Sequence, residues 1–177
     1  ASSLASENVY GANPDLTVTP LPMRTDLPTR PPTMCPGCSH RGVFTVLSRM
    51  KVFVSGDIGC YTLGALPPLA SMHSCVCMGA GIGMAHGMAK VLEPGGRTRN
   101  RPVAVLGDST FFHSGMTPLL NSVWNQSDTV TIILDNRTTA MTGGQQNPGS
   151  GKTLSGKFSP AVDLVKLCEA FGVKHIR

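Results

Sequence analysis

Two apolar runs in this chain end in polar residues whose side chains suit a metal ion. The run Val103–Leu106 leads into Gly107 and Asp108, and the run Thr129–Leu134 leads into a turn that holds Asn136. Asp108 and Asn136 lie 28 positions apart. Buried parallel strands joined by a helix would bring both side chains to one edge of a sheet. Carboxylate and amide oxygens at such an edge suit Mg²⁺, with phosphate oxygens completing its shell.

The elements that position these residues alternate between helix and strand. Helices are predicted over 40–50, 78–92, 115–125 and 160–171, and strands over 51–56, 102–107, 129–135 and 173–176. The last helix is expected to open at Ser159 and Pro160, which suit an N-cap and a first turn. A Gly-rich loop is expected over 142–151. The alternation predicts an α/β fold, a three-layer sandwich with a mainly parallel sheet.

Residues 1–33 differ from the rest of the chain. They are rich in Pro, Ser and Thr and hold no lasting helical or strand period, which indicates a linker or an extended arm. Residues 34–177 are expected to form the folded domain. The chain lacks an initiator Met and stops at Arg177 inside a predicted strand, so we expect a fragment of a longer polypeptide.

Composition narrows the function classes. Hydrophobic residues make up 41% of the 177, enough for a sizeable core, so wholesale disorder is not expected. The net charge of +5 is scattered, apart from Arg97–Arg101, so no nucleic-acid partner is expected. That cluster fits a solvated loop or a positive face for an acidic electron carrier. The sequence has no signal peptide or membrane-length apolar run, and its six cysteines suit a reducing, cytoplasmic location.

Five motifs that carry chemistry occur in order along the chain. They are Cys35-Pro-Gly-Cys38-Ser-His-Arg-Gly42, Ser55-Gly-Asp-Ile-Gly-Cys60, Cys77-Met-Gly-Ala-Gly-Ile-Gly-Met-Ala-His-Gly87, Gly107-Asp-Ser-Thr-Phe-Phe-His-Ser-Gly115 and Leu134-Asp-Asn-Arg-Thr-Thr-Ala-Met-Thr-Gly143. The set resembles the thiamine-diphosphate domain of the 2-oxoacid:ferredoxin oxidoreductases, and most of all the large subunit of the indolepyruvate type. The resemblance covers about residues 31–177. It implies the thiamine-diphosphate-binding (PP-type) fold.

The resemblance assigns the ligands of a magnesium–diphosphate site. Asp108 and Asn136 would bind Mg²⁺ through their side chains, and Thr138 through its main-chain carbonyl. Ser109 stands where the family often has Gly. Further cofactor-binding residues expected around this centre are Gly59, Cys60, Met78, Gly79, Gly81, Gly107, Ser109 and Thr110. The simpler alternative is that Asp108 caps a helix and Asn136 lies in a turn.

The glycine-rich segment Met78–Gly83 is a poor dinucleotide fingerprint. The strand before it is weak, and no acidic residue follows at the distance that such a motif needs. In the resembled family this segment lies against the cofactor. Its small residues would allow close approach to a ligand, although simple helix packing would also explain them.

Three cysteines have the spacing of a cluster site. In several members of the resembled family, equivalents of Cys35, Cys38 and Cys60 hold a 4Fe–4S cluster. The fourth ligand there lies past the end of this chain, and the other three cysteines do not match it. Zinc or free thiols are the alternatives.

The resemblance also implies a reaction and partners. It implies oxidative decarboxylation of arylpyruvates such as indolepyruvate to aryl-acyl-CoA, with coenzyme A as acyl acceptor and electrons passed to ferredoxin. A pyrimidine-binding domain would supply a glutamate that this chain lacks, and a small beta subunit would complete the enzyme. The segment alone is therefore expected to be inactive. His113 is the candidate catalytic residue, although a helix-start histidine without such a role is the alternative.

Two other functions stay open. A non-oxidative thiamine-dependent decarboxylase would share the diphosphate motif but would need no cluster. A structural module would use Cys35 and Cys38 to hold zinc. Binding of thiamine diphosphate separates the structural module from both enzymes, and reduction of ferredoxin or a viologen dye by a 2-oxoacid separates the two enzymes.

Overall fold

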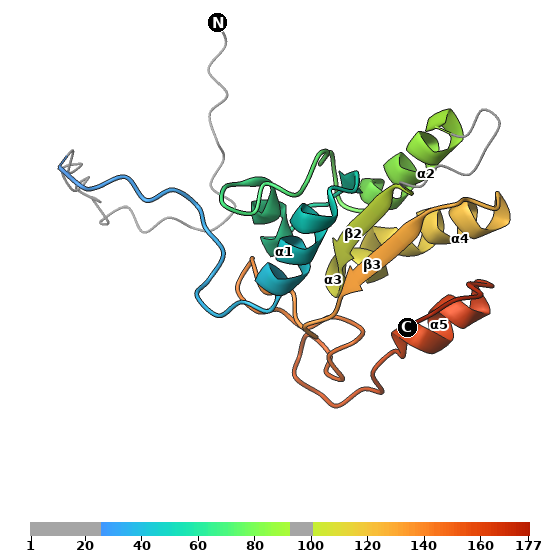
Figure 1. Ribbon diagram of the computed structural model, residues 1–177. Coiled ribbons are helices and arrows are strands. Elements are labelled where there is room, and N and C mark those ends of the chain that lie inside the picture. The colour runs from blue at the N-terminus through green and yellow to red at the C-terminus, as the bar shows by residue number, and fades with distance from the viewer. Residues whose placement is uncertain (1–25, 93–100) are drawn as a thin grey trace, which may run out of the picture. The chain divides into compact units, whose positions relative to one another are not determined.

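The computed structural model describes residues 26–92 and 101–177 (Figure 1). The chain divides into two units, Ala1–Pro31 and Pro32–Arg177, and every helix and strand described below belongs to the second. Most of the basic cluster expected at Arg97–Arg101 lies outside the described residues. Within the described ranges, no helix is long and apolar enough to cross a membrane.

Three parallel strands form the sheet. They are β1 (Val54–Ser55), β2 (Val103–Gly107) and β3 (Val130–Leu134), in the order β1-β2-β3. The register pairs Gly107 with Leu134, the last residues of β2 and β3. The residues that follow these two strands therefore leave the sheet at the same edge. The parallel sheet predicted from the apolar runs is confirmed.

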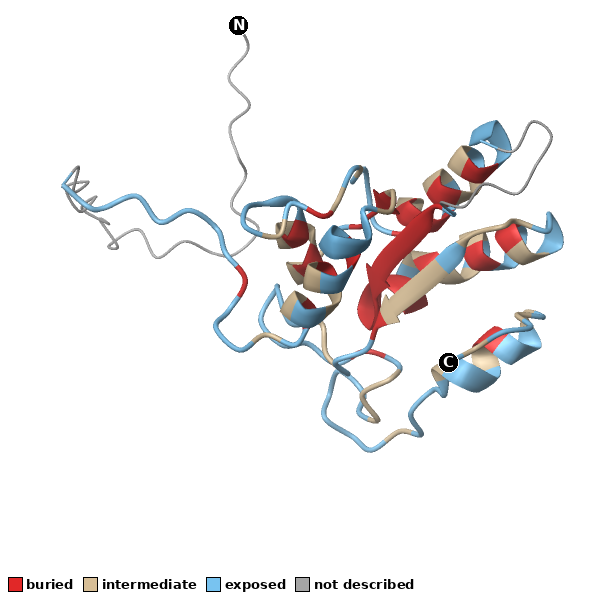
Figure 2. Cartoon of the chain, viewed as in Figure 1, coloured by how far each residue is buried: buried red, intermediate tan, exposed pale blue. Residues whose placement is uncertain are grey.

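Helices cover both faces of the sheet, and the two faces of β2 pack into separate cores. Every residue of β2 is buried, and the strand is red along its whole length in Figure 2. Val103 and Val105 pack in one core with α1 (His40–Met50), whereas Ala104 and Leu106 pack in a second core with α2 (Ala80–Leu92), α4 (Met116–Trp124) and α5 (Leu164–Ala170). The three-layer α/β prediction is confirmed.

Three short helical segments adjoin the carboxyl edge of the sheet. A 3-10 helix, η1 (Cys60–Ala65), follows β1, while α3 (Asp108–Thr110) and the π-helical turn η2 (Phe111–Gly115) lie between β2 and α4. The chain is thus helical from Asp108 onward, earlier than the predicted start near residue 115. Single π-helical turns inside a helix are frequent at functional sites.

The predicted helix at the carboxyl-terminal end is present, but it starts four residues later than expected. The helix predicted over 160–171 spans Leu164–Ala170, and its N-cap is Asp163, whose carboxylate accepts from the N–H groups of Val165 and Lys166. Residues 160–162 are not helical because the N–H of Val162 donates to the carbonyl of Pro148. A favourable N-cap pair at Ser159 and Pro160 was therefore overridden by a tertiary hydrogen bond.

The strand predicted over 173–176 is absent from the described residues. Gly172, at φ +87°, ends α5, and the N–H of Val173 turns back to the carbonyl of Cys168. Val173 and Ile176 pack against the second core instead. These residues are therefore apolar because they pack against this core, not because they pair in a strand. The strand predicted over 51–56 is shorter, since Lys51 is the left-handed cap of α1 and only Val54–Ser55 pair with β2.

Candidate functional site

A cavity of about 120 Å³ opens at the carboxyl edge of the sheet. The start of α1, the turn after β1, the junction of β2 with α3 and the turn after β3 all contribute to its wall. Of the residues expected to bind a cofactor, nine line it: Gly59, Cys60, Met78, Gly107, Asp108, Ser109, Thr110, Asn136 and Thr138. With His40, which also lines the cavity, the structure brings all five sequence motifs to one place.

Asp108 is the central acidic group of this cavity. It follows β2 directly and is 2% exposed. Its Oδ2 accepts a hydrogen bond from Nδ2 of Asn147, which is also buried, at 2.9 Å. Nearby, Oγ1 of Thr139 donates to Oγ of Ser109 at 2.7 Å. Two hydrogen bonds thus fasten the segment after β3 to the first helical turn after β2.

Asn147 was missed by the sequence analysis. It lies in the predicted Gly-rich loop, 39 positions from Asp108, and belongs to none of the five motifs. Its Oδ1 accepts from the N–H of Gly149 at 2.9 Å, so the side chain both shapes its own loop and meets the carboxylate. The only sequence signal is Asn147-Pro-Gly, which predicts a turn and nothing about its partner.

A second group of hydrogen bonds fixes the turn after β1. The hydroxyl of Tyr61 donates to the carbonyl of Ile58 at 2.6 Å and lies 2.8 Å from Oγ1 of Thr110. The Tyr61 ring also covers Gly107, where an added Cβ would lie 2.7 Å from the ring. Gly107 is therefore required by close packing at the end of β2. Tyr61 links the turn after β1 to the helical start after β2.

The turn after β3 presents the oxygen groups expected to bind a metal. Arg137 has a positive φ of 55°, which is uncommon outside glycine and concentrates at ligand-binding turns. The N–H of Thr138 donates to Oδ1 of Asn136 at 3.3 Å. An amide oxygen has two acceptor sites, so Oδ1 keeps one for a cation. This geometry sets Asn136 and Thr138 together on the wall that faces Asp108.

His40 is the histidine that the structure places at the cavity. It begins α1, is buried, lines the cavity and lies edge-on to the Tyr61 ring, with 6.3 Å between ring centroids. Burial lowers the pKa of His40, and the nearby Asp108 acts in the opposite direction. His113 is exposed within η2 and does not line the cavity. The sequence signal for His40 was its place directly after Cys35-Pro-Gly-Cys38.

Gly79 and Gly81 lie behind the cavity wall. Their N–H groups donate to the carboxylate of Asp57, a fully buried residue that the sequence analysis did not single out. They act on the cavity through their neighbour Met78, which lines it. Of the glycine-rich segment, one side chain therefore faces the site and two backbone positions anchor it.

The three cysteines of the predicted cluster site lie within electrostatic range of one another. Burial raises the pKa of the Cys60 thiol, and Cys38 and Cys35 raise it further. Arg41 holds the Cys35–Cys38 turn by donating to the carbonyls of Met34 and Cys35. In residues 26–92 and 101–177, no three acidic, cysteine or histidine side chains form a ready-made metal site.

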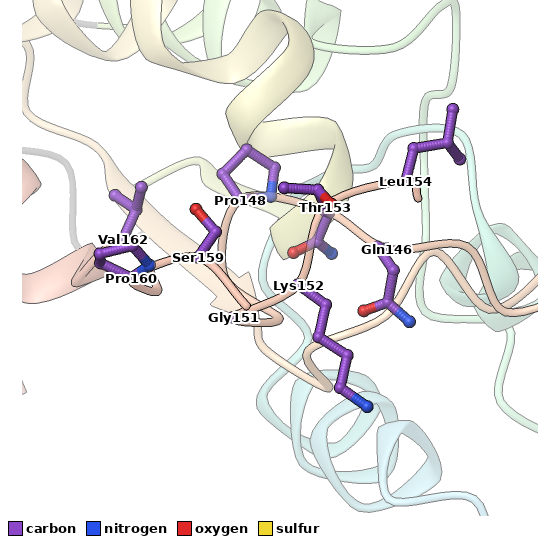
Figure 3. A pocket seen from close by; sticks show the side chains of 10 residues that line it. Gln146, Pro148, Gly151, Lys152, Thr153, Leu154, Ser159, Pro160 and Val162 are labelled. Atoms are coloured by element: carbon purple, nitrogen blue, oxygen red, sulfur yellow. The ribbon is translucent and has the colours of Figure 1, made fainter. Parts of the chain in front are cut away.

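A larger cavity of about 360 Å³ lies elsewhere, in the loop between β3 and α5 (Figure 3). Its wall combines prolines and aliphatic side chains with Lys152 and polar groups of the same loop. Asn147 borders it and is the link to Asp108. Size alone would favour this cavity, but the predicted ligands line the smaller one, which is therefore the candidate site.

The groups around the smaller cavity fit a magnesium-bound diphosphate. Asp108 and Asn136 supply oxygen ligands of the kind that Mg²⁺ binds, and the carbonyl of Thr138 belongs to the same turn. Ser109 and Thr110 begin a helical segment, where the first N–H groups lack partners within the helix and suit phosphate oxygens. The residue types that line the cavity are thus ones that fit such a group.

Comparison with known proteins gives a consistent result. Residues 57–177 match the family described as thiamine pyrophosphate enzyme, C-terminal TPP binding domain. The chain is 42% identical over 154 residues to the indolepyruvate oxidoreductase subunit IorA of Archaeoglobus fulgidus, and 42% identical over 153 residues to that of Thermococcus kodakarensis. These matches cover 84% and 79% of the chain but 24% of each relative. The chain therefore spans about a quarter of the length of these relatives.

Replacing Asn147 by Ala is expected to lower the free energy of unfolding by about 1–3 kcal/mol, because a buried carboxylate oxygen loses its donor. Urea titration followed by circular dichroism measures this change. The matched control is Gln146→Ala at the exposed neighbouring position, where a change within about 0.5 kcal/mol is expected. Equal effects of the two substitutions would contradict the structural role given to the Asn147–Asp108 hydrogen bond.

Proposed function

This chain belongs to the thiamine pyrophosphate enzymes as their C-terminal cofactor-binding domain, and we propose that it holds thiamine diphosphate and Mg²⁺ at the carboxyl-edge cavity. One observation carries the proposal. Asp108 and Asn136 follow neighbouring parallel strands and line the same cavity, which places two oxygen ligands around one point. The match of residues 57–177 to the cofactor-binding domain supports the choice of cofactor.

Different residues around the cavity bind the metal ion and the phosphate groups. Asp108, Asn136 and the carbonyl of Thr138 bind Mg²⁺, and the N–H and hydroxyl groups of Ser109 and Thr110 meet phosphate oxygens. When bound there, thiamine diphosphate would supply a nucleophilic carbon and an electron sink for the decarboxylation of a 2-oxoacid.

The organic end of the cofactor would lie against the other wall of the cavity. Met78, Gly59 and Cys60 form that wall, and Tyr61 holds the turn that carries two of them. Met78 and Ile58 offer apolar surface, which suits an aromatic ring and excludes water from it. Of the two histidines near this region, His40 lines the cavity and is placed to orient a substrate, whereas His113 is exposed.

For the whole protein we propose the oxidative decarboxylation of an arylpyruvate to an aryl-acyl-CoA and carbon dioxide. The relatives are named indolepyruvate oxidoreductase subunits, which supports indolepyruvate as such a substrate. Coenzyme A would accept the acyl group and ferredoxin the electrons. A pyrimidine-binding domain and a small beta subunit would complete the site, because the described residues place no glutamate at the cavity. None of the six cysteines, all of which are described, forms a disulfide, which fits a cytoplasmic enzyme. Turnover by this segment alone would contradict the shared-site proposal.

Calorimetric titration of thiamine diphosphate with Mg²⁺ into the full-length protein tests the cofactor site. Asp108→Ala is expected to weaken binding by about 100-fold or more and Asn136→Ala by about tenfold, since even indirect partners of a metal are worth about 10- to 100-fold. The loss follows because each substitution removes an oxygen ligand.

The matched control is Asp128→Ala, which removes a carboxylate at the opposite end of the sheet, where Asp128 pairs with Arg101. This variant is expected to bind as the unmodified protein does. Undiminished binding by the Asp108 and Asn136 variants would refute the site, and no binding by the unmodified protein would leave the structural-module function in first place.

Substitution of each histidine in the full-length enzyme distinguishes the role of His40 from that of His113. His40→Gln is expected to lower kcat/KM for a 2-oxoacid by about 10- to 100-fold, the worth of one hydrogen bond to a charged group. His113→Gln is expected to change it less than twofold, because that side chain is exposed and outside the cavity. Steady-state kinetics with a viologen dye as electron acceptor provides the measurement, and the reverse order of effects would restore His113 as the catalytic residue.

We also propose that Cys35, Cys38 and Cys60 hold a 4Fe–4S cluster with a fourth thiolate from outside this chain. The contribution of Cys38 and Cys35 to the raised pKa of the Cys60 thiol supports this proposal, and thiolates are the ligands that such clusters use. In anaerobically purified full-length protein, Cys60→Ser is expected to lose about four iron atoms and the matching acid-labile sulfide. The control is Cys77→Ser, because Cys77 is exposed and does not match a ligand position of the resembled family. This variant is expected to lose no iron. Equal iron contents would favour free thiols.

A further inference from the structure

Asp57 is a buried carboxylate whose hydrogen bonds all come from the protein backbone. Its side chain is 0% exposed. Oδ1 accepts from the N–H groups of Ile58, at 2.8 Å, and Gly79, at 3.0 Å. Oδ2 accepts from Gly79, at 2.9 Å, and Gly81, at 3.1 Å. Both oxygens are thus occupied by main-chain donors from two separate segments.

N–H groups at the start of α2 stabilise the negative charge of Asp57. None of the ion pairs between described residues includes Asp57. Burial raises the pKa of this carboxyl, and the hydrogen bonds from Ile58, Gly81 and Gly79 oppose that change. The first N–H groups of a helix lack intrahelical partners and carry partial positive charge, so the carboxylate and the helix start satisfy each other.

Glycines at 79 and 81 are required for this arrangement. Gly79 has φ +86°, and an added Cβ would lie 2.5 Å from the carbonyl oxygen of Ser114. At Gly81 an added Cβ would lie 2.9 Å from the carbonyl oxygen of Gly56 and 3.2 Å from Oδ2 of Asp57. Gly81 therefore allows close approach to the segment that carries Asp57, and Gly79 allows close approach to η2.

The main chain around Asp57 is held as firmly as its side chain. Oγ1 of Thr62 donates to the carbonyl of Asp57 at 2.7 Å and accepts from the N–H of Gly59 at 2.9 Å. Gly59 and Met78 both line the cofactor cavity, on segments that lie directly beside the carboxylate's donors. Asp57 itself does not line the cavity.

We propose that Asp57 is a positioning residue: its carboxylate fastens the start of α2 to the turn after β1 and so fixes Met78 and Gly59 on the same wall of the cavity. The inference rests on the proposed cofactor site. Asp57 acts through its neighbours and touches neither cofactor nor substrate. Loss of one carboxylate oxygen leaves N–H groups of α2 without an acceptor and frees Met78 to move, so the wall against the organic end of the cofactor loses its shape.

Asp57→Asn in the full-length protein tests this role. An amide nitrogen cannot accept from the N–H of Gly79 or Gly81, so affinity for thiamine diphosphate with Mg²⁺ is expected to fall at least tenfold by calorimetry. Hydrogen exchange of the peptide that contains Gly79 and Gly81 is expected to accelerate in the same variant. A merely stabilising role would lower the melting temperature and leave both readouts unchanged well below it.

Asp163→Asn is the matched control. Asp163 also caps a helix, since its Oδ1 accepts from the N–H groups of Val165 and Lys166, but it is exposed and outside the cavity. This variant is expected to bind the cofactor within twofold of the unmodified protein. If Asp57→Asn fails to fold, Gly81→Ala is the second variant. Its added Cβ disturbs the contact between Gly81 and the carboxylate of Asp57, which is itself retained. The same tenfold loss of affinity for thiamine diphosphate is expected.

The outcomes separate the two proposals. Unmodified protein that does not bind thiamine diphosphate refutes the cofactor site and the role of Asp57 with it. Unmodified protein that binds, together with folded Asp57→Asn or Gly81→Ala that binds within twofold of it, overturns the role of Asp57 alone. Binding lost in the Asp163→Asn control to the same extent would also overturn it, because any helix cap would then have the same effect.

Discussion

Parallel pairing of β2 with β3 is the constraint on which the whole site depends. The register that sets Gly107 opposite Leu134 sends the chain out of both strands at one edge, so Asp108 and the turn with Asn136 must lie near each other. An antiparallel pair would place these ends on opposite edges. The buried, apolar character of β2 serves this register, since both of its faces are covered by helices. Core packing therefore positions the polar groups without contacting a ligand.

The parts of the site that could be predicted from sequence were those whose position follows from strand ends. Asp108 and Asn136 are placed by local pattern alone, because an apolar run followed by a polar residue defines both the strand and its edge. The turn of Cys35 and Cys38 is local in the same way. By contrast, Asn147 meets Asp108 through a loop whose path no periodicity describes. His40 could be assigned to a helix, but its burial beside Asp108 depends on how α1 packs on the sheet.

The errors at the carboxyl-terminal end have the same origin. Ser159 and Pro160 are residue types that favour a helix start. The N–H of Val162 nevertheless donates to a carbonyl across the loop, and the helix begins after its N-cap, Asp163. Val173 and Ile176 have the apolar character of a strand, yet they pack against the second core. Local preference amounts to a few tenths of a kcal/mol to about 1 kcal/mol per residue, which one tertiary hydrogen bond or one buried side chain outweighs.

The two buried aspartates, Asp57 and Asp108, differ in the hydrogen-bond donors that surround them. Both Asp57 and Asp108 follow buried strands of the sheet, and both are almost fully enclosed. The protein occupies both oxygens of Asp57 with N–H donors from two segments. Among the described residues, Asn147 donates to Oδ2 of Asp108, which leaves Oδ1 for the cation that we propose. The backbone donors around Asp57, which depend on Gly79 and Gly81 and not on the aspartates themselves, therefore support different proposed roles for the two carboxylates.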